Sequence, residues 1–75
     1  MLRELDRAVL EVDLPAHGLK AGDIGTVVLE HDGRGFEVEF LTLDGETLAV
    51  VSLASNEVRP VRAREIAQAR LVGSH

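Results

Sequence analysis

The stretch His17-Gly18-Leu19-Lys20-Ala21-Gly22-Asp23-Ile24-Gly25-Thr26-Val27-Val28 decides the fold of this chain. Its first half carries glycines, which reach backbone angles that other residues avoid, and its second half is a β-branched run that suits a pleated strand. We interpret Gly22 and Gly25 as the two positions that bracket a turn, where the chain reverses and enters a sheet. The stretch therefore predicts a long loop, from Pro15 to Asp23, followed by a strand.

Alternating and β-branched segments on both sides of this stretch predict further strands. Pro15 ends the first strand and Pro60 confines the last to an edge or a terminus, because proline lacks the N–H that a sheet ladder needs. Two turns carrying Asp-Gly, at residues 31–35 and 42–46, predict hairpins, and residues 54–57 fit one tight helical turn. The expected strands cover residues 8–14, 24–30, 36–41, 47–53 and 58–61.

Two segments predict packing contacts that a single sheet does not provide. Residues 47–53 are almost continuously apolar, which is typical of a strand buried on both faces, so the tail or another subunit is expected to cover one of them. From Arg62 to Val72 the apolar residues follow a helical period, which predicts a C-terminal helix over 62–72. We interpret residues 1–61 as the sheet domain and residues 73–75 as the remnant of an expression tag.

One small domain is expected from 75 residues, because a chain of this length buries only about 60% of its unfolded surface. The absence of cysteine excludes disulfides and thiolate metal ligands. Apolar residues make up 45% of the chain and the only aromatic residues are Phe36 and Phe40, so the core is expected to be aliphatic. The charged N-terminus shows no signal peptide and the apolar runs are too short to cross a bilayer, which favours a cytoplasmic location.

The net charge of −5 is unevenly distributed. Residues 1–58 carry twelve acidic and four basic side chains, a balance of −8, whereas residues 59–75 carry four arginines and one glutamate, a balance of +3. An acidic body repels phosphate backbones, which disfavours nucleic-acid binding by that part of the chain. The basic tail is expected to pack against the acidic body of its own chain or of a neighbour.

Serine and histidine residues do not form a recognisable catalytic or metal-binding pattern. Ser52 and Ser55 lack the sequence motif of an activated nucleophile, and geometry rather than residue presence defines such sites. His17 and His31 belong to different loops, so they are not expected to converge on a metal ion. No catalytic residue, metal ligand or cofactor is therefore predicted.

The glycines of the 31–35 turn and the two glutamates that follow it are also expected to have structural roles. Gly33 and Gly35 lie in an expected hairpin and not in a strand-to-helix turn, so they do not predict phosphate binding. Glu37 and Glu39 alternate with apolar residues and are expected on a solvated face, with nothing nearby to perturb their ionisation.

Several phrases, taken together, resemble the bacterial family named domain of unknown function 4926. They are Leu5-Asp6-Arg7-x-Val9-Leu10, Asp13-Leu14-Pro15-x-His17-Gly18-Leu19-Lys20-x-Gly22-Asp23-x-Gly25-Thr26-Val27-Val28, Glu37-Val38-Glu39-Phe40, Leu43-Asp44-Gly45-Glu46-Thr47 and Val58-Arg59-Pro60-Val61. The resemblance covers residues 2 to about 70 and implies an SH3-like barrel without assigned catalytic residues. The chain is thus expected to be all-β, a small five-stranded, partly open SH3-like barrel with a short C-terminal helix.

Two functions from different classes follow from these features. The first is a non-catalytic interaction module that binds a protein partner, itself or both; the product of a neighbouring gene is one such partner, and a homo-oligomer is expected. The alternative is an RNA- or ribosome-associated module, since residues 22–28 are distantly similar to the KOW motif. In this alternative the basic tail, together with Lys20 and Arg34, supplies the positive charge. The residues expected to make binding contacts are His17, Lys20, Arg59, Arg62, Arg64 and Arg70.

Overall fold

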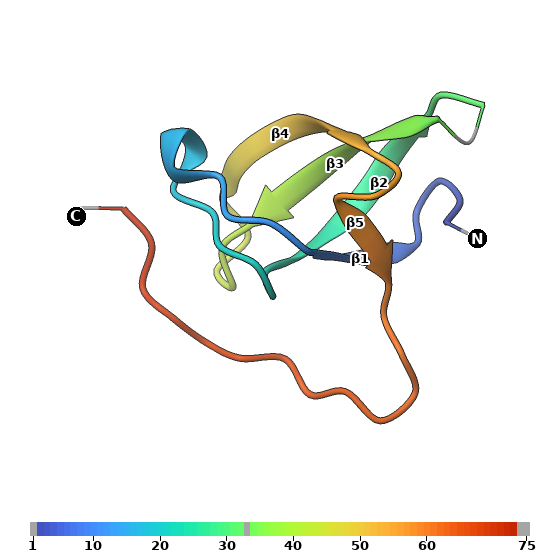
Figure 1. The fold of residues 1–75 in the computed structure, drawn as a ribbon. Coiled ribbons are helices and arrows are strands. Elements are labelled where there is room, and N and C mark those ends of the chain that lie inside the picture. Colours follow the sequence, from blue (N-terminus) through green and yellow to red (C-terminus); the bar gives the residue numbers. More distant parts are fainter. Residues whose placement is uncertain (1, 33, 74–75) are drawn as a thin grey trace.

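A computed structural model describes residues 2–32 and 34–73, which form one five-stranded antiparallel sheet (Figure 1). The strands are β1 (Arg7–Leu10), β2 (Ile24–Glu30), β3 (Gly35–Leu41), β4 (Thr47–Ala54) and β5 (Val58–Pro60). They lie in the order β4-β3-β2-β1-β5, so the sheet is not closed and β4 and β5 are its two edges. Within the described ranges no helix is long and apolar enough to cross a membrane.

The prediction of five strands is confirmed, and β2 has the predicted bounds. β1 is shorter than expected, because the chain leaves the sheet after Leu10. Leu14 and Leu19 then pair with each other across the loop, through backbone hydrogen bonds of 2.9 and 3.1 Å. Within that small loop η1 (Pro15–His17) forms a single 3-10 turn. Pro60 lies on an edge strand, as its missing N–H requires. Gly33 and residues 74–75, which include two of the three residues assigned to a tag remnant, lie outside the described residues.

The two glycines of the deciding stretch have different roles, and one prediction about them is wrong. Gly22 has a φ of +97°, a turn conformation that favours glycine. Gly25 instead lies inside β2, paired with Ala8 of β1. A Cβ atom there would stand 2.6 Å from Val38 Cγ1 and 2.8 Å from the carbonyl oxygen of Glu39. Gly25 therefore allows β2 to approach β3, and it does not bracket the turn.

The core lies on one face of the curled sheet, and both phenylalanines belong to it. Leu10, Val27 and Val38 are its largest fully buried side chains. Leu2 and Leu19, from segments outside the strands, also belong to this cluster. The core is largely aliphatic, and every other buried member comes from a strand: Ala8, Phe36, Phe40, Val51, Leu53 and Val58.

A β-bulge at Val28 changes which side chains of β2 face the core. Val27 pairs with Val38 and Leu29 pairs with Glu37, so Val28 is the extra residue. Because side chains alternate between faces, one inserted residue turns Leu29 away from the core and leaves it 44% exposed. The outer face of the sheet thus carries apolar side chains beside its glutamates.

The expectation that the tail of the same chain covers the second face of β4 is wrong. Val51 and Leu53 belong to the core, whereas Val50 is 54% exposed and Ser52 is exposed. The apolar run that suggested double burial has another cause: Leu48 is an extra residue between the pairs Phe40–Ala49 and Leu41–Thr47, and it packs against the core from that position. β4 is therefore an edge strand with one solvated face.

The predicted helix over residues 62–72 is also wrong. After β5 the chain makes one hydrogen-bonded turn, from the Arg62 carbonyl to the Glu65 N–H at 3.3 Å, and then runs without regular structure. Figure 1 shows this tail, in orange and red, passing from β5 along one side of the sheet toward η1. Ile66 is 93% exposed and Leu71 is 96% exposed, so the two largest residues of the apolar stripe that suggested a helix are not buried.

The tail passes over the outer side of β1. Val9 points away from the core cluster but is only 6% exposed. Its cross-strand neighbours are Ile24 and Arg59, and it lines a small cleft together with Val61 and Ala67 of the tail. The tail therefore covers a part of the sheet that the core does not use.

Candidate functional site

The loop between β1 and β2 meets the tail at one side chain, Arg70. Its Nε donates a hydrogen bond to Asp23 Oδ1 at 2.8 Å, and its Nη2 pairs with the other oxygen of the same carboxylate. Nη2 also donates to the carbonyl oxygen of Gly18 at 3.1 Å. A planar guanidinium bound to both oxygens of a carboxylate has a fixed orientation, which a lysine does not give. The basic tail thus packs on the acidic body of its own chain.

The loop holds the Asp23 carboxylate in place without help from the tail. The backbone N–H of Lys20 donates to Asp23 Oδ2 at 2.8 Å, and Gly22 N–H donates to the carbonyl oxygen of Leu10 at 2.7 Å. Partial burial raises the pKa of Asp23, but the hydrogen bonds from Arg70 and from the Lys20 N–H, with the nearby positive charges, outweigh it and leave that pKa below its usual value. Asp23 is therefore a carboxylate, oriented by the loop itself, at neutral pH.

A second ion pair fixes the start of the tail. Arg59 on β5 binds both oxygens of Glu65, with Nη1–Oε1 and Nη2–Oε2 distances of 2.9 and 2.6 Å. Its Nε lies 3.4 Å from Glu11 Oε1. The hydrogen bonds from Arg59 and from the Arg62 N–H lower the pKa of Glu65 to about 2. The hydrogen bond to Glu65, with the negative charges of Glu65 and Glu11, raises the pKa of Arg59. Arg59 thus joins β5 to the start of the tail.

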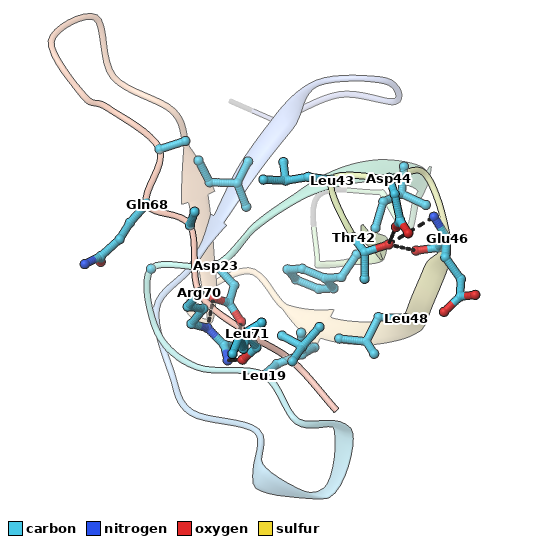
Figure 2. Close-up of a pocket in the computed structure, with 17 residues that line it drawn as sticks. Leu19, Asp23, Thr42, Leu43, Asp44, Glu46, Leu48, Gln68, Arg70 and Leu71 are labelled. Carbon is cyan, nitrogen blue, oxygen red and sulfur yellow. Dashed lines mark hydrogen bonds and ion pairs between the residues drawn. The ribbon is translucent and has the colours of Figure 1, made fainter. Parts of the chain in front are cut away.

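Between the Arg70–Asp23 contact and the β3–β4 turn lies a cleft of about 470 Å³ (Figure 2). Asp23 and Arg70 stand at one end, and Thr42, Asp44 and Glu46 stand at the other. At the second end the Thr42 hydroxyl donates to Asp44, and the Glu46 N–H donates to Thr42 Oγ1 at 3.1 Å. The side chains between the two ends are mainly apolar: Leu19, Ile24, Phe40, Leu41, Leu43 and Leu48 on the body, and Ala67, Ala69, Leu71 and Val72 on the tail.

The structure brings some of the predicted contact residues together and separates others. Arg70 reaches the loop that contains Lys20, whose side chain is exposed. His17 is exposed in η1. Arg62 and Arg64 are exposed on the tail, and among the ion pairs of the described residues neither side chain takes part.

Sequence reasoning missed the acceptors of these arginines. Asp23 was interpreted only as a turn residue, and Gly18 contributes a carbonyl oxygen that no side-chain pattern can indicate. The sequence does indicate Glu65 as an acceptor, since it is the single acidic residue beside the four arginines of residues 59–75. An isolated opposite charge in a basic segment is a natural partner for one of its neighbours.

A separate polar cluster lies on the outer face of the sheet. Ser52 Oγ donates to Glu37 Oε2 at 2.6 Å, and His31 Nε2 lies 2.9 Å from the same oxygen. The hydrogen bonds from Ser52 and His31 lower the pKa of Glu37, so the expectation that its ionisation is unperturbed is wrong. The carboxylate stands between the hydroxyl and the imidazole. The hydrogen bonds of Ser52 and His31 in this cluster are both made to Glu37.

Comparison with known proteins gives a family and no function. The model of a family described as a domain of unknown function, DUF4926, matches residues 4–60. The chain belongs to the DUF4926 family. The match spans all five strands and ends at the last residue of β5, so the matched range contains Asp23 and Arg59, and Glu65 and Arg70 lie after it. No curated protein and no solved structure matches the chain.

Proposed function

We propose that this chain is a non-catalytic interaction module that binds a protein partner, itself or both. We also propose that its open, curled five-stranded sheet is of the SH3-like type, as the order of its strands and its long first loop suggest. One observation carries the proposed function: the two edges of the sheet differ, and only one of them is protected against pairing with another strand.

The β5 edge is protected in three ways. It is three residues long, it contains Pro60, and Arg59 stands on it in contact with Glu65. Short length, proline and charge are the usual means by which edge strands avoid unwanted pairing.

The β4 edge has none of these protections. Its eight residues, Thr47 to Ala54, contain no charged side chain and no proline. Ser55 N–H donates to the Arg34 carbonyl at 3.3 Å in continuation of the β3–β4 ladder. Because the direction of hydrogen bonding alternates along an antiparallel pair, Val50 and Ser52 turn their backbone N–H and C=O groups outward. These groups can accept an added strand.

Glu57 closes this edge at one end. Its carboxylate accepts a hydrogen bond from the Ala54 N–H at 2.8 Å, and its own N–H donates to the Ala54 carbonyl at 2.9 Å. The segment available to a second strand is therefore centred on Val51, with Val50 and Ser52 supplying the hydrogen bonds. Two copies paired antiparallel about Val51 would satisfy both residues of each chain.

Size-exclusion chromatography with light scattering, over a wide range of protein concentration, tests the self-association. We expect a dimer that Val50→Lys abolishes, because a lysine on an edge strand opposes pairing. Leu5→Lys is the control, since Leu5 is an exposed leucine outside β4. A monomer at every concentration removes self-association from the proposal. The partner is then sought by co-purification with wild-type and Val50→Lys chains, and a partner retained equally by both overturns the role of the β4 edge.

The RNA-binding alternative is not developed further, because no specific observation favours it. Of the four arginines in residues 59–75, Arg59 and Arg70 form ion pairs with carboxylates of the same chain. Phosphate contacts need such side chains to be available.

A further inference from the structure

The cleft at Asp23 does not include Val50 or Ser52 of the β4 edge. We propose that it receives an arginine-bearing, extended segment of a partner protein, and that Arg70 occupies it in cis as an intramolecular competitor. This inference rests on the proposed role as an interaction module. It concerns a different set of residues, so it can fail independently.

The first argument is that the receptor side of the cleft is formed by the body of the chain. Lys20 N–H orients the Asp23 carboxylate, and Ala21 N–H donates to Asp13 Oδ1 at 2.9 Å in the same loop. The Gly18 carbonyl adds a third acceptor for a guanidinium. The hydrogen bonds donated by the Lys20 and Ala21 N–H groups do not involve the tail, so the carboxylate that accepts an arginine is oriented whether or not Arg70 occupies the cleft.

The second argument is that the tail fills the cleft incompletely. Leu71, the residue after Arg70, is 96% exposed, and a volume of about 470 Å³ stays open between the tail and the body. The apolar floor at Ile24 and Phe40 can receive a side chain that the tail does not supply. The tail is thus held mainly by its ion pairs and by its covalent connection to β5, and a segment with better apolar contacts can displace it.

The third argument is charge. The cleft has a carboxylate at one end, Asp23, and two at the other, Asp44 and Glu46, within a body of net charge −8 over residues 1–58. Oppositely charged surfaces favour encounter and discriminate against acidic partners. A basic segment with an apolar residue beside its arginine is the ligand that this surface complements.

The test uses the full chain and a labelled peptide with the sequence of residues 66–72, in fluorescence polarisation. A tethered tail competes at an effective concentration of order millimolar, so the wild-type chain should bind the peptide weakly. Arg70→Ala removes the competitor, and we expect at least a tenfold tighter Kd. Arg64→Ala is the matched control, since Arg64 lies on the same tail outside the ion pairs, and it should leave the Kd unchanged.

Two further variants localise the binding. The double variant Arg70→Ala, Asp23→Asn should lose the tighter peptide binding of Arg70→Ala. Asparagine keeps an acceptor for the Lys20 N–H but removes the negative charge. A peptide whose arginine is replaced by alanine should not bind Arg70→Ala. Equal binding by wild type and Arg70→Ala, or binding that ignores Asp23→Asn, overturns the proposal.

The dimerisation assay separates this inference from the proposed function. Val50→Lys should leave peptide binding by the Arg70→Ala chain unchanged, because Val50 does not line the cleft. A wild-type dimer that Asp23→Asn dissolves and Val50→Lys does not would mean that the occupant is the tail of a second copy. That result overturns the assignment of the cleft to a partner protein.

Discussion

Arg59 and Glu65 are joined by two hydrogen bonds, from each terminal nitrogen of the guanidinium to a different oxygen of the carboxylate. The Arg62 N–H donates to the same carboxylate at 2.6 Å. Glu65 therefore holds together the end of the sheet and the start of the tail. Its pKa of about 2 reflects these contacts, since each of them favours the charged form.

Acidification is expected to release the tail before it unfolds the sheet. The pKa of Glu65 is lower in the folded chain than its ordinary value of 4.5. Its contribution is therefore complete above pH 4.5 and is lost as the pH falls toward about 2. In an NMR titration the methyl signals of Ala67 and Ala69 should shift over this range, ahead of that of the core residue Val38. Glu65→Gln should shift the Ala67 methyl signal in the same direction at neutral pH, although the Arg70–Asp23 contact still holds the end of the tail. Tail and core signals that move together at every pH would contradict this order of events.

Gly25→Ala is expected to destabilise the fold by steric overlap. The added Cβ would meet Val38 Cγ1 at 2.6 Å and the Glu39 carbonyl at 2.8 Å, and a backbone atom cannot give way as a flexible side chain can. Overpacking of this kind costs about 1–3 kcal/mol. The measurement is the free energy of unfolding in urea. Gly45→Ala is the comparison, because Gly45 has a φ of +93° and open space around it, so its cost is backbone strain alone. A Gly25→Ala chain as stable as wild type would disprove the close approach.

Truncation of a core leucine should cost far more than truncation of an exposed one. Leu10 is 1% exposed at the centre of the core, and Leu10→Ala is expected to lose about 2–5 kcal/mol. Leu43 is 93% exposed in the β3–β4 turn, and Leu43→Ala should stay within about 0.5 kcal/mol of wild type. Thermal unfolding followed by circular dichroism measures both. A comparable loss in the two variants would be inconsistent with a core confined to one face of the sheet.

Ser52→Ala is expected to raise the pKa of Glu37. The Ser52 hydroxyl is the largest cause of the lowered value, with His31 next. Carbon-detected NMR titration of the Glu37 carboxyl group measures the change, and the shift should be smaller in His31→Ala. Thr47→Ala serves as control because the Thr47 hydroxyl donates to Glu39 and not to Glu37. A Glu37 pKa that does not respond to the loss of Ser52 would rule out this hydrogen bond.

Local sequence patterns predicted the sheet well because the strands follow a period that side-chain chemistry imposes. Phe36, Val38 and Phe40 alternate with glutamates, and they enter the core as that alternation requires. β4 was misjudged because Leu48 at a bulge makes an alternating strand look continuously apolar. A bulge depends on the pairing between two strands, so one strand read alone does not reveal it.

The structure of the tail and of the candidate site was harder to predict, because it too depends on contacts between separate segments of the chain. A stripe of Ala63, Ile66, Ala67 and Leu71 fits a helix, yet a short helix needs a surface to dock on, and the ion pairs at Glu65 and Arg70 hold the chain extended instead. The Arg70–Asp23 contact joins residues 47 positions apart. The tail's charge indicated that it would meet the acidic body, but the choice of Asp23 depends on where the folded loop places its carboxylate.

The burial of Val9 beneath the tail has a consequence for how the family diversifies. The match to the DUF4926 family ends at β5, whereas the residues that pass over Val9 belong to the segment after it. A relative whose chain stops at β5 leaves this position open to water, where a polar residue is more favourable than valine. The appended segment and the residue at this one place in β1 should therefore be inherited together, and a change of one should be accompanied by a change of the other.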